Sequence, residues 1–171
     1  MIRTEVSMLS KIFPNTQHAT KAPTKNSDLL TSWRKIVLPA VSAPFSMRSV
    51  HAACRLFKEA GAEELRFLYV VEVPRSVALK ASMPVEDGMA EDALGAAVSA
   101  AAAFGVHAHT EVLHVREATD GIAKFVASQN FDLIVLGARA DGLRGLPLDV
   151  CRDLYQKVEC EVILNYVGAE A

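Results

Sequence analysis

The sequence predicts an α/β fold: an open, doubly wound parallel sheet with helices on both faces. Short runs of almost wholly apolar residues recur along the chain, which is typical of strands buried on both sides. Segments with helical spacing separate these runs in strict alternation, as in βαβ units. The length of 171 residues allows one domain whose core needs neither metal nor disulfide for stability.

The first strand and helix open this alternation. An apolar strand over residues 35–39 is followed by Ser46, a residue type that caps helices. Val50, Cys54 and Phe57 then fall at positions i, i+4 and i+7, the spacing of one buried helical stripe. These two elements form the first unit of the predicted sheet.

The second unit contains the longest expected loop. Gly61 ends the first helix, because glycine readily adopts the left-handed conformation that closes many helices. A second apolar strand covers residues 65–71, and a loop rich in proline and methionine follows over 73–88. An alanine-rich helix over 91–104 then ends at Gly105.

Three more strands complete the prediction. Residues 107–115 form the third strand, and a helix over 118–129 leads to the fourth, at 133–136. Pro147 suits the first turn of the last helix, since its fixed backbone angle matches a helix and its missing N–H would be unpaired there. The fifth strand is expected at 161–166, so five strands alternate with four helices.

The stretch from Phe131 to Ala140 indicates where a ligand would be found. Its apolar run stops in Gly-x-Arg, at Gly137 and Arg139, and glycine permits a tight exit from a buried strand. In wound α/β sheets, ligands bind at the carboxyl ends of strands. The sequence therefore places a candidate site in the loop after the fourth strand.

Charge and cysteine content exclude several classes of partner. A formal net charge of −2 gives no strong field toward nucleic acid or an acidic membrane, and no apolar run reaches membrane-spanning length. Cys54, Cys151 and Cys160 form no CxxC pair and are odd in number, which favours a reducing compartment over a zinc site or disulfides. We therefore expect a cytoplasmic protein that binds neither nucleic acid nor membrane.

Residues 1–33 are expected to be a flexible N-terminal extension. They are rich in Thr, Ser, Lys and Asn and show no sustained helical or strand period. A transit peptide is the alternative, because basic and hydroxyl residues dominate and Glu5 and Asp28 are the acids. A disordered tail is the preferred interpretation, with the folded domain over 34–168.

Residues 35–166 resemble the universal stress protein family along their whole length. The resemblance is carried by KIVLPAVSAP for the first strand and turn, LYVVEVP for the second strand, FDLIVLGARADGLRGL for the fourth strand and glycine loop, and CEVILNY for the last strand. It implies an adenine-nucleotide alpha hydrolase-like sheet in the order 3-2-1-4-5. It also implies a role in stress response without a dedicated catalytic group.

The resemblance further implies a homodimer in which the last strand, at 162–166, meets its twofold mate. An exposed apolar edge strand otherwise invites aggregation, which is an independent physical reason for pairing. The sequence contains no Walker loop, Gly-x-Ser-x-Gly elbow or HExxH motif. We therefore expect a non-enzymatic dimer that works through a protein partner of unknown identity.

The nucleotide motif of the family's ATP-binding members is degraded at its first positions. In those members an Asp closes the first strand and accepts hydrogen bonds from the ribose, and glycines leave room for the phosphates. Val41 stands at the position of the Asp. Gly137 matches the first glycine, but Ala140 stands at the second.

The later positions of the motif depart as well. Where the family has Gly followed by Ser or Thr, counting forward gives Val150 and Cys151, and counting backward from Cys160 gives Leu148 and Asp149. A branched side chain blocks the approach of a phosphate, and a carboxylate repels it. We therefore expect no bound cofactor.

The remaining matches leave a second hypothesis open. Val70 resembles the family's residue beside the adenine. The positions of the family's nucleotide site are thus Val41, Val70, Gly137, Arg139, Ala140, Gly142 and Gly145. Arg139 and the backbone at Gly142 and Gly145 could bind ATP or another adenine nucleotide through a rearranged loop, since Arg suits phosphate oxygens. Alternatively, the loop arginines pair with neighbouring aspartates.

Two other features bear on chemistry. His107 and His109 share a strand face with Glu111, but a polar outer face explains them more simply than a metal site. Cys151 lies in the first turn of the last helix, where the helix dipole lowers a thiol pKa, and it also shares that helix's buried stripe. We expect core packing for Cys151 and no metal, with a redox role as the least supported hypothesis.

Overall fold

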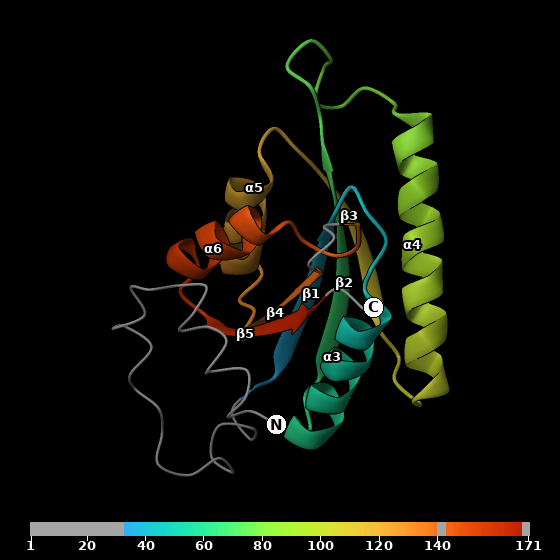
Figure 1. Cartoon of the computed structure of the whole chain (residues 1–171), viewed down its shortest axis with the longest axis vertical. Coiled ribbons are helices and arrows are strands. Elements are labelled where there is room, and N and C mark those ends of the chain that lie inside the picture. The colour runs from blue at the N-terminus through green and yellow to red at the C-terminus, as the bar shows by residue number, and fades with distance from the viewer. Residues whose placement is uncertain (1–32, 140–142, 169–171) are drawn as a thin grey trace.

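The computed structural model describes residues 33–139 and 143–168, and it has the predicted architecture (Figure 1). A five-stranded parallel sheet has the order β3-β2-β1-β4-β5. The elements are β1 (Lys35–Val41), α3 (Met47–Ala60), β2 (Glu64–Glu72), α4 (Pro84–Ala103), β3 (His109–Val115), α5 (Ala118–Ser128), β4 (Leu133–Arg139), α6 (Leu148–Lys157) and β5 (Glu161–Val167). The fold class and strand order expected from the sequence are confirmed.

Two helices cover each face of the sheet (Figure 1): α3 and α4 pack together on one face, and α5 and α6 on the other. Leu38 and Phe67 belong to the core beneath α3 and α4, whereas Val37 and Leu68 belong to the core beneath α5 and α6. Because successive strand residues point to opposite faces, one apolar run builds both cores. No helix in the described ranges is long and apolar enough to cross a membrane.

Helix α4 begins at Pro84 and not near residue 91, as the sequence analysis expects. The carboxylate of Asp87, in its first turn, accepts a 3.4 Å hydrogen bond from the N–H of Met83 and contacts Nε2 of His114 at 2.9 Å. Proline at the start and acidic residues in the first turn favour a helix here. The prediction was wrong because it extended the preceding loop too far.

Strands β1 and β4 are longer than expected at their carboxyl ends. β1 continues to Val41, and β4 continues to Arg139. Gly137, expected as the exit from the fourth strand, stays in register with Asn165 of β5. Because β4 stays paired with β5, it continues beyond Gly137 to Arg139. The loop that could face a ligand therefore starts later than the sequence analysis places it.

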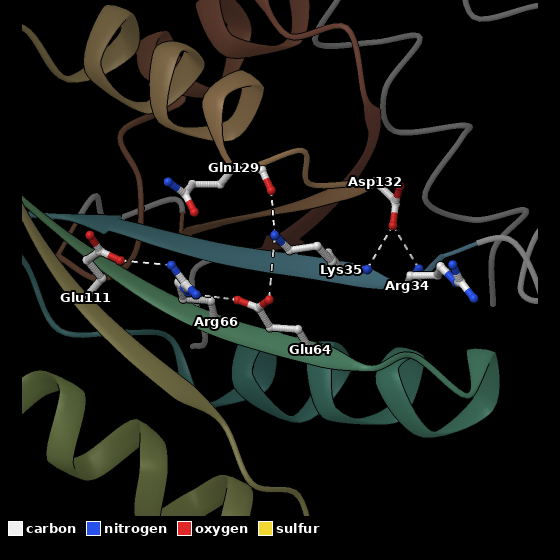
Figure 2. Close-up of polar contacts among 7 residues, drawn as sticks. All are labelled: Arg34, Lys35, Glu64, Arg66, Glu111, Gln129 and Asp132. Carbon is white, nitrogen blue, oxygen red and sulfur yellow. Dashed lines mark hydrogen bonds and ion pairs between the residues drawn. The ribbon is translucent and has the colours of Figure 1, made fainter.

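Charged side chains form a network at the amino edge of the sheet (Figure 2). The carboxylate of Asp132, just before β4, accepts hydrogen bonds from the backbone N–H groups of Arg34 and Lys35 at 2.9 and 2.8 Å. Arg66 of β2 contacts Glu111 of β3 at 2.9 Å. The network fixes the direction in which the chain enters β1.

Trp33 belongs to the folded part of the chain. Its side chain is buried, and its Nε1 donates a 2.7 Å hydrogen bond to Oε2 of Glu161. A buried indole usually pairs its N–H in this way. The structure thus places Trp33, which the sequence analysis assigns to the N-terminal extension, in the core. The rest of that extension, residues 1–32, lies outside the described residues.

Candidate functional site at the carboxyl edge of the sheet

The candidate site lies between the carboxyl ends of β1 and β4. The chain leaves β1 toward β2 on one side, and β4 lies on the other side of β1, so the winding reverses here. Such a switch point opens the crevice in which doubly wound folds bind ligands. The loop after β1 and the residues that follow 142 meet in this place.

In this chain a segment of its own backbone, residues 143–146, bonds to the ends of β1 and β4 at the switch point, and we call it the closing segment. The N–H of Val41 donates to the carbonyl of Gly145 at 3.1 Å, and the N–H of Gly145 donates to the carbonyl of Pro44 at 2.7 Å. The N–H of Leu146 donates to the carbonyl of Gly137 at 2.8 Å. Through Gly145 and Leu146, the closing segment therefore ties the ends of β1 and β4 together.

The side chains at this point are core residues. Leu146 and Val70 are fully buried and Val41 is 9% exposed, all in the core beneath α5 and α6. Neither valine carries an acceptor for a ribose hydroxyl, and a hydroxyl left unpaired there costs about 1–3 kcal/mol. Val41 therefore does not fit a ribose bound as the family resemblance implies, whereas Val70 matches the residue that the resemblance places beside the adenine.

Gly137 lies where the packing of the protein leaves no room for a side chain. A Cβ added at this residue would lie 2.3 Å from the Oγ of Ser49 on α3. Ser49 is buried, and its Oγ donates a 3.1 Å hydrogen bond to Oδ1 of Asn165 on β5. Glycine at 137 makes room for this contact between α3, β4 and β5.

Gly145 meets a different requirement. Its φ is +72°, a conformation that residues with a side chain rarely adopt. A Cβ here would lie 2.2 Å from the carbonyl oxygen of Gly137. Ser42, which follows β1, is also left-handed, with φ 46°, and its N–H donates to the carbonyl of Val70 at 2.9 Å. Backbone hydrogen bonds thus hold Ser42 and Gly145 in left-handed conformations at the crevice.

The other residues of the predicted site are only partly described. Arg139 is the last residue of β4, and its side chain lies outside the described atoms. Ala140 and Gly142 lie outside the described residues. The structure therefore brings Val41, Val70, Gly137 and Gly145 together, and the rest of the predicted site is not described.

Sequence reasoning missed Pro44 and Leu146. Pro44 contributes a backbone carbonyl, and Leu146 contributes a buried side chain and a backbone N–H. Backbone contacts between distant segments leave no residue pattern in a sequence. The sequence feature that could have indicated this contact was Leu146, an apolar residue between Gly145 and Pro147.

At the carboxyl edge of the sheet, two carboxylates of this chain accept hydrogen bonds from the first N–H groups of α5. The side chain of Glu117 accepts hydrogen bonds from the N–H groups of Thr119 at 3.1 Å and Asp120 at 2.8 Å. Glu72 accepts one from the N–H of Ala118 at 2.8 Å. Because negative charge already pairs with these donors, a phosphate is disfavoured at this helix start.

The histidines noted in the sequence lie at the other end of β3. The ring centroids of His107 and His109 are 5.5 Å apart in an edge-on arrangement, and Glu111 is engaged by Arg66. Within residues 33–139 and 143–168, no group of three or more His, Cys, Asp or Glu could hold a metal ion.

Cys151 packs in the core beneath α6 and is fully buried. Burial, and secondarily the negative charge of Asp149, raises the pKa of its thiol to about 12. Desolvation of the thiolate therefore outweighs the lowering that the helix start favours. This geometry supports the packing interpretation of Cys151.

We expect Cys151 to stay unlabelled when the native protein is treated with a thiol reagent at pH 8. A thiol with this pKa is ionised to roughly one part in ten thousand at pH 8. The unfolded thiol ionises near 9.0 and the folded one near 12, so this residue's contribution to stability is lost as pH rises between those values. Peptide mass spectrometry checks the labelling, and unfolded protein is the control. Rapid stoichiometric labelling of native Cys151 would contradict this account.

The chain belongs to the universal stress protein family. The family's sequence model matches residues 32–164, which span the whole sheet except its last three positions. The resemblance noted in the sequence is therefore confirmed at the level of the family. No curated protein sequence is significantly similar to this chain.

Solved structures share the fold. The universal stress protein from Archaeoglobus fulgidus has a TM-score of 0.58 at 22% identity, covering 77% of this chain and 93% of that one. A structure of the universal stress protein from the same organism in complex with dAMP has a TM-score of 0.61 at 20% identity, covering 77% and 97%. A universal stress protein family protein from Arabidopsis thaliana with AMP bound has a TM-score of 0.53 at 16% identity, covering 80% and 93%.

Proposed function

We propose that this chain is a non-enzymatic, dimeric module of the universal stress type, which acts in stress response without binding ATP at the switch point. The closing segment carries the proposal. Gly145 is hydrogen-bonded both to Val41 and to Pro44, and Leu146 is fully buried in the core beneath α5 and α6. Structural neighbours have been solved with dAMP and with AMP. This chain would differ from them in having filled the crevice.

Several features support the rest of the proposal. The chain lacks the common catalytic motifs, and the carboxylates at the start of α5 are engaged in capping that helix. Cys54, Cys151 and Cys160 are free thiols, as expected in the cytoplasm. The module would comprise residues 34–168 and act through contacts with a protein partner.

The dimer is proposed to form through β5. This strand lies at one edge of the sheet, and Val162, Ile163 and Tyr166 are half-buried along it. An unpaired apolar edge is a template for another strand, and a twofold axis satisfies it by pairing the strand with its own copy.

Light scattering tests the nucleotide-independent dimer directly. We expect a mass of twice the 18.5 kDa of one chain, both without nucleotide and with millimolar ATP and Mg. A monomer in both conditions would remove the dimer from the proposal. A mass that changes on adding ATP would favour the alternative, an adenine-nucleotide switch that uses Arg139 and the backbone at Gly142 and Gly145.

A charge on β5 is expected to dissociate the dimer. Val162→Lys places a cation on the edge that pairs, and lysine on an edge strand opposes strand addition. The matched control is Val112→Lys on β3, the other edge strand, where the side chain is 37% exposed. We expect only the first variant to shift toward the monomer mass in light scattering. An equal response of both variants would show that β5 is not the interface.

A further inference from the structure

Strand β3 forms the second edge of the sheet, opposite β5, and no described residue pairs with its outer side. The carbonyl of Val115 accepts a 2.8 Å hydrogen bond from the N–H of Val73, so the backbone of Val115 faces β2. Successive strand residues direct their backbone groups alternately to the two sides, and those of Thr110, Val112 and His114 therefore face outward. β3 thus presents a row of backbone donors and acceptors that another strand could pair with.

This edge lacks the features that usually prevent strand addition. Natural edge strands are guarded by lysine, proline, bulges or inward-pointing charges. The sequence of β3, HTEVLHV, contains neither lysine nor proline, and its register with β2 runs without a bulge from His109 to Val115. Its carboxylate, Glu111, is paired with Arg66 at 2.9 Å. The edge is therefore open to another strand.

Helix α4 packs beside this edge and supplies charge of one sign. Its first half contains the acids Glu86, Asp87, Glu91 and Asp92, and the whole helix has no lysine, arginine or histidine. Asp87 contacts His114 of β3 at 2.9 Å. Glu91 and Asp92 are exposed and have no ion-pair partner among the described residues. The start of α4 is therefore a source of negative charge next to β3.

Glu91 is the acid that an added strand would meet. α4 runs opposite in direction to β3, and the contact between Asp87 and His114 aligns the two elements (Figure 1). Val112 lies two residues back along β3, a step of roughly 7 Å, and the same step along α4 is about four residues. Glu91 follows Asp87 by one helical turn on the same side of α4, so it lies about level with Val112.

The two faces of the sheet require different side chains from an added strand. On the α4 face, Val112 is 37% exposed, and lysine or arginine would cover it with an apolar stem while its charge reaches Glu91. On the other face, Leu113 and Val115 are half-buried and pack against the core beneath α5 and α6, so apolar side chains suit. The edge therefore fits an extended segment in which basic and apolar residues alternate.

We propose that β3 and the adjoining side of α4 bind such a basic and apolar segment of a protein partner, which adds to the sheet as a sixth strand. A second copy of this chain is disfavoured, because pairing at β3 as well as at β5 would extend the sheet without closing the assembly. The inference rests on the proposed function, since it names the surface for its protein partner. Light scattering tests the dimer and peptide binding tests β3, so the two can fail separately.

The probe is a fluorescein-labelled peptide, Lys-Val-Lys-Val-Lys-Val-Lys, whose anisotropy is measured against increasing concentrations of the full chain. The control peptide is N-methylated at every backbone nitrogen, which keeps the charges and removes the donors of a strand. Val112→Pro removes an outward N–H of β3 and leaves its hydrogen bonds to β2 in place. Glu91→Lys reverses the charge beside the edge, and Glu59→Lys, at an exposed position on α3, is its matched control.

We expect saturable binding of the first peptide by the parent and by Glu59→Lys. Its affinity is expected to fall by about fivefold or more in Val112→Pro and in Glu91→Lys. Circular dichroism checks that every variant is folded. No binding to the parent, equal binding of the N-methylated peptide, or an unchanged affinity in either folded variant would overturn the proposal. An assembly heavier than a dimer that Val112→Pro disperses would also overturn it, because a second copy would then occupy β3.

Discussion

Replacing Gly145 by Ala is expected to lower the free energy of unfolding by about 2–4 kcal/mol, since a left-handed Ala costs about 1 kcal/mol and overpacking adds about 1–3. The φ of this residue is +72°, and the new Cβ would lie 2.2 Å from the carbonyl oxygen of Gly137. The closing segment cannot shift freely, because Val41 and Pro44 hold Gly145 from both sides. Urea unfolding followed by circular dichroism measures the change.

Gly95 supplies the matched control. It lies in α4 with nothing within 4 Å of an added Cβ. Ala has the higher helix propensity, so Gly95→Ala is expected to raise the free energy of unfolding by about 0.5–1 kcal/mol. If Gly145→Ala were as stable as the parent, the closing segment would not be a fixed part of the fold.

Restoring the family's acidic residue with Val41→Asp is expected to destabilise the protein by about 3–5 kcal/mol, the cost of an unpaired buried charge. Val41 is 9% exposed and packs in the same core as Leu146. A carboxylate there loses its water, and we expect the closing segment, which bonds to the backbone of Val41, to keep a ribose away from it. The variant is therefore expected to gain no affinity for ATP.

The destabilisation by Val41→Asp is expected to depend on pH, and a second variant serves as its control. Burial raises the pKa of a carboxyl above its unfolded value near 4, so the destabilisation shrinks as pH falls and the group becomes neutral. Val85→Asp makes the same change at a side chain that is 71% exposed in the first turn of α4, where an acid is favourable. Urea unfolding of both variants checks the contrast. A stable Val41→Asp variant that binds ATP would show that the crevice can open.

The strands were predictable because burial on both faces of a sheet demands continuous apolar runs, as in Leu133 to Leu136. Local chemistry also gave correct helix ends, such as Gly61 with φ 63°. The start of α4 was missed because Pro84 and Asp87 are equally common in loops. Local sequence signals thus predicted which helices and strands form more accurately than they predicted where each one begins or ends.

Only part of the candidate site could be predicted from the sequence. The sequence showed that Val41 cannot accept a ribose hydroxyl, but it could not show that the backbone of Gly145 bonds to that of Val41. That contact joins residues far apart in the chain through a backbone N–H and a carbonyl, which every residue except proline carries together. Likewise, the glycine at 137 was visible, whereas its neighbour Ser49 was not.

The most direct test of the central claim is a calorimetric titration of the purified chain with ATP in the presence of Mg, preceded by a check for co-purified nucleotide. If Gly145 and Leu146 close the crevice as described, no saturable heat appears up to millimolar ATP. Saturable binding with a micromolar Kd would contradict the account, because the nucleotide would have displaced the closing segment.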